Sequence, residues 1–386
     1  MMEVWLEKLD TLVLFRHLLD DPVIARFRTL LSERSACAYA AFAAALFVHT
    51  DNFSDYLLNC VLEDENFYMR GRAAGKQFGA EIEASLKREL NLLSQLAVVE
   101  GKELQSELSS QIDLPCWRTG KYDFFTVYCK RMREIGKHGY GIFAKYHMFM
   151  MKDQQLVPVK NPDDTSLDVF SGYELERQAV IGNTRALLEG KPAANVLLYG
   201  DAGTGKSATV KALANAFCQD GLRLIELKKS QLYQIPELVD QLSENPLKFI
   251  LFIDDLSFTA NDDNFAALKA ILEGSVSAKA PNVVVYATSN RRHLVKETFS
   301  GREGDDIHQT DTMEELFSLS DRFGLKVTFM RPDKEHYLQF VLHLAYISGI
   351  NLEQEALDRE AEIFALGRGG RSARAAKQFI DSLLSR

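Results

Sequence analysis

The pattern of apolar positions divides the chain into a helical first part and a second part in which strands and helices alternate. In residues 1–116, apolar side chains recur at helical spacing, with almost no proline and few turn signals. From about residue 161 onward, short apolar runs bounded by turn residues alternate with helical patterns. Such alternation predicts a parallel sheet with helices on both faces. The predicted fold class is therefore α/β, with a helical N-terminal domain in front of it.

The same pattern gives the individual elements. The helical stretches of the first part are residues 5–19, 23–31, 36–48, 53–62 and 82–104. In the second part, the predicted strands are 196–199, 222–227, 249–253, 283–286 and 325–329, and the predicted helices are 174–188, 208–217, 231–242 and 265–272. Three last helices, 333–347, 353–365 and 370–384, predict a small helical lid. We expect domains at 1–116 (helical), 161–330 (α/β core) and 331–386 (lid), joined by a connector at 117–160.

The connector 117–160 has a composition of its own, with nine basic and three acidic residues and many aromatic ones. Basic and aromatic side chains together can form a surface that binds phosphates and stacks on bases. Alternatively, 122–135 is an amphipathic helix and 140–159 a hairpin that turns at 153–155, with the aromatic rings in a core. We favour the second interpretation.

Composition and charge narrow the classes of protein. A chain of 386 residues suggests two or three domains, and 46% hydrophobic with 26% charged residues is typical of soluble globular proteins. A net charge of -9 means that any nucleic-acid binding has to come from a local patch. The five scattered cysteines and the lack of an evident signal segment favour reduced thiols and a cytoplasmic location. The longest apolar run, 36–48, is shorter than the roughly 20 residues of a membrane span.

The candidate chemistry begins with a glycine-rich segment between the strand at 196–199 and the helix at 208–217. Glycines let backbone N–H groups turn toward phosphate oxygens, a lysine supplies charge for the outer phosphates, and a serine hydroxyl can bind Mg²⁺. We therefore predict an ATP-binding phosphate loop, a Walker A motif. Its residues are Gly200, Asp201, Ala202, Gly203, Thr204, Gly205, Lys206 and Ser207.

Polar residues at the ends of two later strands complete this site. Asp254 and Asp255 follow the strand at 249–253, as in a Walker B motif, and Asn290 follows the strand that starts at 283. Because ligands bind at the carboxyl ends of parallel strands, these side chains should meet the phosphate loop. We expect Asp254, with Ser207, to hold Mg²⁺. We expect Asp255 to orient or deprotonate an attacking water, and Asn290 to contact the γ-phosphate or that water.

The order of these motifs resembles that of the AAA+ ATPases. More narrowly, residues 140–386 look like a bacterial AAA+ family catalogued as a domain of unknown function, family number 815. The resemblance implies that Arg322 is an arginine finger acting on the neighbouring subunit, and that Arg371 is a lid arginine contacting the nucleotide, with Arg374 as the fallback. It also implies that the segment with Phe170 and Tyr173 lies against adenine.

The leading hypothesis is an ATP hydrolase that assembles as a homo-oligomer, a ring or an open assembly, and remodels a macromolecular partner. Protein and DNA both remain open as the partner, and Arg291, Arg292 and the connector are the hints toward DNA. Hydrolysis is expected to be slow because Asp255 stands where many AAA+ members have glutamate. Residues 228–236 lack the aromatic-apolar-glycine motif with which threading unfoldases hold their substrate. This argues against a protein-unfolding motor. The alternative is an ATP-dependent switch or scaffold that binds a protein through residues 1–116.

Overall fold

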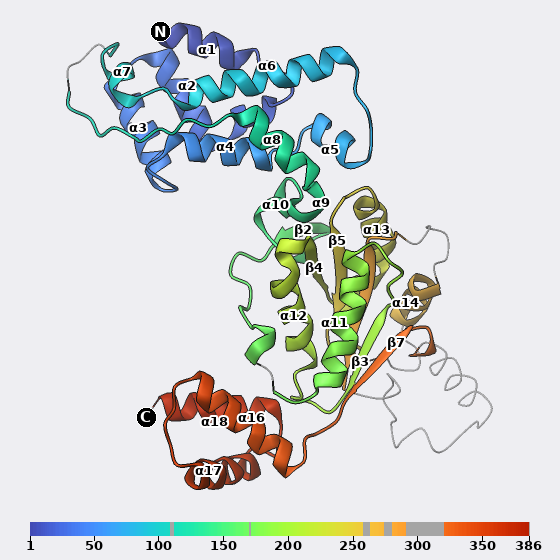
Figure 1. Ribbon diagram of the computed structural model, residues 1–386. Helices are drawn as coiled ribbons and strands as arrows, with labels where there is room; N and C mark the ends of the chain where they lie inside the picture. The colour runs from blue at the N-terminus through green and yellow to red at the C-terminus, as the bar shows by residue number, and fades with distance from the viewer. Residues whose placement is uncertain (109–111, 170, 258–262, 274–279, 291–319, 386) are drawn as a thin grey trace. The chain divides into compact units, whose positions relative to one another are not determined.

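The chain folds into two compact units, Met1–Lys145 and Tyr146–Arg386 (Figure 1). The computed structural model describes residues 1–108, 112–169, 171–257, 263–273, 280–290 and 320–385. Phe170, Arg291 and Arg292 lie outside these ranges. The described parts confirm the predicted fold class: a mostly parallel sheet between helices, a helical lid after it and a helical N-terminal unit.

The first unit consists of helices. Its long helices are α2 (Pro22–Glu33), α3 (Ala36–Phe47), α4 (Phe53–Glu63) and α6 (Ala80–Ala97), and its shorter elements are α1 (Met2–Asp10), η1 (Arg16–Asp20), α5 (Phe67–Ala73), α7 (Gly101–Gln105), α8 (Phe124–Arg133), α9 (Ile135–His138) and α10 (Ile142–Lys145). Asp21 and Ser35 start α2 and α3 by accepting hydrogen bonds from N–H groups of the first turn. The predicted helices at 23–31, 36–48 and 53–62 are confirmed, whereas the stretch 5–19 is divided between α1 and η1, and the stretch 82–104 between α6 and α7.

An aromatic cluster lies in the core of this unit. The rings of Phe27, Phe42, Phe53 and Trp117 pack at centroid distances of 4.8–6.4 Å, and all four side chains are buried. Such edge and tilted contacts add to the stabilisation that comes from burial of the rings. Trp117, from the predicted connector, is therefore a core residue of the first unit.

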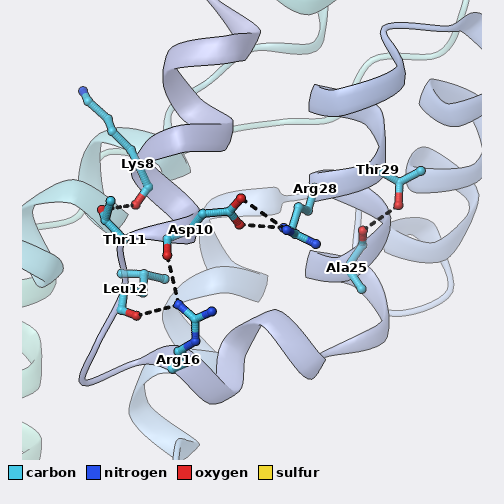
Figure 2. Close-up of polar contacts among 8 residues, drawn as sticks. All are labelled: Lys8, Asp10, Thr11, Leu12, Arg16, Ala25, Arg28 and Thr29. Carbon is cyan, nitrogen blue, oxygen red and sulfur yellow. Dashed lines mark hydrogen bonds and ion pairs between the residues drawn. The ribbon is translucent and has the colours of Figure 1, made fainter.

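Polar contacts fix the first helices to one another (Figure 2). The Arg28 guanidinium on α2 makes a two-bond contact with the Asp10 carboxylate at the end of α1, at 2.7 and 3.2 Å. Nη1 of Arg16 donates to the carbonyl oxygens of Asp10 and Leu12. Hydrogen bonding to Arg28 lowers the pKa of Asp10. Both side chains of the ion pair are partly exposed, so the pair orients α1 more than it stabilises the unit.

Glu89 is a buried carboxylate in the same unit. Its two oxygens accept hydrogen bonds from the backbone N–H groups of Val13, Leu14 and Phe15, at 3.0–3.2 Å. These three groups lie in the irregular segment between α1 and η1, where no helical partner is available to them. One side chain of α6 thus satisfies a stretch of backbone about 75 residues away in sequence.

Residues 117–160, predicted as a connector, are shared between the two units. Those up to 145 pack in the first unit, where Phe124, Tyr128 and Tyr140 belong to its core. Residues 148–158 form a hairpin of the second unit, with its turn at Asp153 and Gln154, both at positive φ. The structure thus favours the interpretation in which these aromatic rings lie in a core. The predicted domain boundaries stay predictions.

The second unit has a seven-stranded sheet with the order β2-β1-β4-β5-β6-β3-β7. Its strands are β1 (Met148–Lys152), β2 (Gln155–Pro158), β3 (Val196–Gly200), β4 (Leu222–Leu227), β5 (Lys248–Ile253), β6 (Val283–Ser289) and β7 (Leu325–Phe329). β2 is antiparallel to β1, and the other pairs are parallel. β3 lies between β6 and β7, so the ends of these three strands are neighbours in space.

Helices cover both faces of this sheet (Figure 1). On one face, α11 (Glu174–Leu188) and α12 (Lys206–Phe217) pack against alternate strand residues, such as Leu198 and Tyr286. On the other face lie α13 (Ile235–Ser243), preceded by η4 (Lys229–Gln234), and α14 (Asp263–Glu273). The short elements η2 (Leu167–Val169) and η3 (Cys218–Asp220) complete this part.

The lid is a three-helix unit after β7, made of α16 (Lys334–Ile347), α17 (Gln354–Gly367) and α18 (Ala373–Leu384). Its core contains Tyr337, Phe340 and Phe379. Asp333 and Ser372 start α16 and α18 by accepting hydrogen bonds from N–H groups of the first turn. The predicted lid helices are confirmed, although the last one begins at Ala373, three residues later than expected.

Candidate functional site

The glycine-rich segment forms a loop between β3 and α12, as the sequence predicts. Gly200, Gly203 and Gly205 all have positive φ, which only glycine adopts readily. At Gly200 a Cβ atom would lie 2.0 Å from the carbonyl oxygen of Phe329 on β7, so no other residue fits there. α12 starts at Lys206 directly after the loop. Its first N–H groups and its positive helix end therefore face the loop, an arrangement that suits an anion.

Lys206 is almost completely buried and occupies the centre of the loop. Its ammonium donates to the carbonyl oxygens of Gly200 and Asp201, at 3.0 and 2.6 Å, and to Oδ1 of Asn290, at 3.1 Å. Burial lowers the pKa of Lys206, and the carboxylates of Asp201, Asp254 and Asp255 oppose that shift. Oxygen atoms of the loop and of Asn290 therefore hold the Lys206 ammonium in place. There its positive charge can bind the negatively charged outer phosphates of a nucleotide.

Asp254 and Ser207 lie side by side at the start of α12. The Ser207 hydroxyl donates to Oδ1 of Asp254 at 2.5 Å. Thr288, on β6, donates its hydroxyl to the same oxygen at 2.5 Å. One carboxylate and one hydroxyl beside a phosphate loop are the protein ligands that suit Mg²⁺, which keeps most of its waters and takes further oxygens from phosphate. The residues present therefore fit the predicted magnesium site.

Asp255 and Asn290 form a second pair next to it. Asp255 has φ +51, a conformation that costs free energy for a residue with a side chain. Its backbone N–H donates to Oγ1 of Thr288 at 3.0 Å, and its carboxylate accepts from Nδ2 of Asn290 at 2.8 Å. Because Asn290 also accepts from Lys206, a continuous chain of hydrogen bonds joins Asp255 to the phosphate loop. The structure thus brings the five predicted residues Ser207, Lys206, Asp254, Asp255 and Asn290 together.

The predicted adenine segment lies at the joint between core and lid. Tyr173 has positive φ, donates its hydroxyl to the carbonyl oxygen of Met330 and packs against the rings of Phe329 and Phe340. Burial raises the pKa of Tyr173 to about 12. Gly172 precedes it, and a Cβ there would lie 2.2 Å from the ring of Phe340. Phe170, the other predicted residue of this segment, lies outside the described residues.

The two lid arginines differ in their surroundings. Arg371 makes a two-bond ion pair with Glu362 of α17, at 2.8 and 2.6 Å, and this hydrogen bonding raises the pKa of Arg371. Arg374 instead lies against the phosphate loop, where its backbone N–H donates to the carbonyl oxygen of Gly203 at 3.0 Å. A Cβ at Gly203 would lie 3.2 Å from the Cβ of Arg374. In this structure Arg374, the fallback of the sequence prediction, lies beside the loop, whereas Arg371 pairs within the lid.

Arg322 lies at the opposite end of the sheet from the phosphate loop. It precedes the amino end of β7, whereas the loop follows the carboxyl end of the parallel neighbouring strand β3. A five-residue strand spans about 16 Å, so Arg322 cannot reach the phosphate loop of its own chain. It lines a cavity of about 620 Å³, together with Asn195, Pro281 and Val283 at the amino ends of other strands.

Some residues at or near this site were not identified from the sequence. Thr288 stands two positions before Asn290, and strand alternation would have placed both on the same face, a signal that could have identified it. Arg331 contacts the loop residue Asp201 through its backbone N–H, and Glu362 pairs with Arg371. No local pattern marks Arg331 or Glu362. The five cysteines all lie in the described part of the chain and are free. Among the described residues, no helix combines the length and the apolar character that a membrane span requires.

Comparisons with solved structures give matches at low similarity. The Holliday junction branch migration motor RuvB from Thermotoga maritima matches with a TM-score of 0.36 and 14% identity, over 57% of this chain and 72% of that one. Two single-residue variants of the same motor match with TM-scores of 0.36 and 0.35 and 15% identity, over the same shares. At this level no role can be carried over from RuvB. A comparison with curated proteins gave no match.

The family comparison covers well over half of the chain. Residues 143–386 match the model of the family described as "Protein of unknown function (DUF815)". That range includes the whole second unit, with its sheet, its phosphate loop and its lid. The chain therefore belongs to the DUF815 family.

Proposed function

We propose that this protein is an AAA+ ATPase that binds Mg-ATP and hydrolyses it. One observation supports this most strongly. Lys206, Ser207, Asp254, Asp255 and Asn290 come from three separate segments, and hydrogen bonds of 2.5–3.1 Å join them around a single loop. A chance glycine-rich turn would not assemble these partners. Phosphoryl transfer needs mainly such positioned charges and donors.

Each residue then has a defined role. Mg²⁺, when bound, would be held by Ser207 and Asp254 and would neutralise charge that develops on the phosphate oxygens. Lys206 and the backbone N–H groups of the loop hold the outer phosphates. Asp255 orients or deprotonates the attacking water, and Asn290 fixes Asp255 through its amide. The short Asp255 side chain supports the proposal of slow hydrolysis.

The lid arginine of this active site is Arg374 in our proposal, with Arg371 in the second place. Two contacts support the order: the backbone of Arg374 binds Gly203 in the loop, and the guanidinium of Arg371 is paired with Glu362. A role of Arg371 at the nucleotide would require this ion pair to break.

We further propose that the protein assembles as a homo-oligomer, in which Arg322 of one subunit completes the site of the next. The position of Arg322, at the end of the sheet away from its own loop, supports a role in trans. The energy of hydrolysis would remodel a macromolecular partner, protein or DNA. The free cysteines support a cytoplasmic location.

A second candidate is a switch or scaffold in which ATP stabilises one arrangement and turnover is incidental. One observation favours it. The carboxylate of Asp255 is engaged by the amide of Asn290, and the residue holds a strained backbone conformation. Both would have to adjust before Asp255 could act on a water.

ATP turnover per subunit, measured with Mg²⁺ over a range of protein concentrations, tests the proposal. Specific activity should rise with concentration and then saturate, because subunits complete one another's sites. Lys206→Ala should abolish ATP binding. Arg322→Ala should lower turnover at least about a hundredfold and leave ATP affinity within about threefold, since loss of a donor to the transition state affects the reaction rather than binding. Arg26→Ala, an exposed arginine of the first unit, is the matched control and should behave like the wild type.

The outcomes separate the two candidates. Activity that is constant per subunit would contradict a role of Arg322 in trans and favour the switch. ATP binding without turnover at any concentration would also favour the switch. Hydrolysis that persists in Lys206→Ala would contradict the site assignment itself.

A further inference from the structure

The second residue of the phosphate loop, Asp201, makes a contact that nucleotide binding does not explain. Its carboxylate Oδ2 accepts a hydrogen bond from the backbone N–H of Arg331 at 2.7 Å. Arg331 lies in the hinge between the end of β7 and Asp333, which starts the first lid helix. We propose that Asp201 is a positioning residue that couples occupation of the phosphate loop to the position of the lid. This inference rests on the proposed ATP binding.

Asp201 is fixed on two sides. Its backbone N–H donates to the carbonyl oxygen of Phe329, the last residue of β7, at 3.0 Å. Its carbonyl oxygen accepts from the Lys206 ammonium at 2.6 Å and from the Thr204 hydroxyl at 2.9 Å. The backbone of Asp201 is therefore bonded to Lys206, which would bind phosphate, and its side chain is bonded to Arg331 in the hinge. A movement of Lys206 can reach the hinge through this one residue.

The phosphate loop holds the lid at a second point. The carbonyl oxygen of Gly203 accepts from the N–H of Arg374, in the first turn of α18. The Arg331 side chain extends toward the turn before α18, since a Cβ at Gly370 would lie 3.0 Å from its Nη1. Two residues of the loop, Asp201 and Gly203, thus bind the beginning of the lid and its last helix. A change in the loop reaches the lid at both places.

The charge of Asp201 gives the coupling a direction. A loop that binds phosphates works through donors and positive charge, so a carboxylate within it opposes anion binding. Burial lowers the pKa of Lys206, and the negative charge of Asp201 opposes that shift. Burial raises the pKa of Tyr173, and the charge of Asp201 adds to that shift. When bound phosphates attract the Lys206 ammonium, it neutralises less of the negative charge of the Asp201 carboxylate. The phosphates themselves then repel that carboxylate. This repulsion weakens the hydrogen bond between Asp201 and the hinge.

Hydrogen exchange of the full chain, with and without Mg-ATP, tests the coupling. In the wild type, we expect ATP to change the exchange rate of the peptide over residues 329–337 at least about threefold. In Asp201→Ala that ATP-dependent change should be lost even at ATP concentrations that saturate the variant, as measured with a fluorescent ATP analogue. Asp240→Ala, an exposed aspartate of α13, is the matched control and should keep the change.

Asp201→Asn separates the hydrogen bond from the charge. Its amide oxygen can still accept from Arg331, so the slow exchange of the hinge without ATP should be retained. Its response to ATP should be smaller than that of the wild type, because the repulsion is gone.

The results distinguish this inference from the proposed function. The coupling would be overturned if Asp201→Ala kept the full wild-type response, or if it lost ATP affinity as Lys206→Ala does, since Asp201 would then only maintain the loop. If the wild-type protein bound no ATP, the proposed function would fail first and the coupling with it.

Discussion

Glu89 illustrates how much of the first unit depends on a single side chain. It is 2% exposed and accepts hydrogen bonds from three consecutive backbone N–H groups, those of residues 13–15. In Glu89→Ala these donors lose their partner in a partly buried environment. We expect the free energy of unfolding of the first unit to fall by about 2–4 kcal/mol. Urea titration followed by tryptophan fluorescence measures this, because both tryptophans, Trp5 and Trp117, belong to this unit.

Glu7→Ala is the control for this measurement. Glu7 is an exposed residue of α1, and its loss should change stability by no more than about 0.5 kcal/mol. A loss in Glu89→Ala that is no larger than in Glu7→Ala would mean that water or another group satisfies the three donors.

At the residue scale, the sequence identified the site residues that stand together in one motif or directly after a predicted strand. Lys206 and Ser207 stand in one motif, and Asp254, Asp255 and Asn290 each end a recognisable strand, so their meeting could be predicted. The ion pair of Arg371 with Glu362 and the contact of Asp201 with Arg331 could not, because no local pattern records which distant residue a side chain will meet.

At the element scale, α11 offers a direct test of helix propensity. Gly182 lies within this helix, is exposed, and has open space where a Cβ would lie. Glycine in a helix interior costs about 0.5–1 kcal/mol relative to alanine. Gly182→Ala should therefore stabilise the second unit by about that amount. Thermal melting followed by circular dichroism measures the shift, and tryptophan fluorescence identifies the part of the signal that comes from the first unit.

Gly200→Ala is the contrasting variant. The same change would place a Cβ 2.0 Å from the carbonyl oxygen of Phe329, at φ +135. We expect it to destabilise the second unit, because the backbone of β3 or β7 has to move. Equal effects of the two substitutions would show that unfolded-state entropy alone governs both.

The pattern of apolar residues placed most elements correctly, because the helices bury one face and the central strands form short, continuously buried runs. The strands β4 and β7 begin and end as predicted, and α11 does as well. The hairpin at 140–159 was predicted too long: its first strand starts at Met148, and residues 142–145 form the short helix α10. That β1 pairs with β4 at the edge of the sheet could not be foreseen, since pairing between strands more than 60 residues apart leaves no local signal.

At the scale of the whole molecule, the important feature is that the two units have separate cores. The buried cluster of the first unit contains residues between Met2 and Tyr140, and the clusters of the second unit begin at Met148. Each unit therefore has a hydrophobic core of its own, as a domain that folds independently does. The division of 117–160 between them was not predicted, because its basic composition, which suggested a connector, reflects the exposed positions and not the buried rings.

Separate cores predict two unfolding transitions, of which ATP should shift only one. Calorimetry of the full chain should show two transitions, and tryptophan fluorescence should follow one of them. Mg-ATP at a hundred times its dissociation constant should stabilise the second unit by about 2.7 kcal/mol, because the ligand binds its folded form alone. The fluorescence transition should stay in place, since Trp5 and Trp117 report the first unit. Lys206→Ala should remove the shift without moving the fluorescence transition. A single transition that ATP shifts in both measurements would instead mean that the two units unfold together, and that the state of the nucleotide site is communicated to the N-terminal helices.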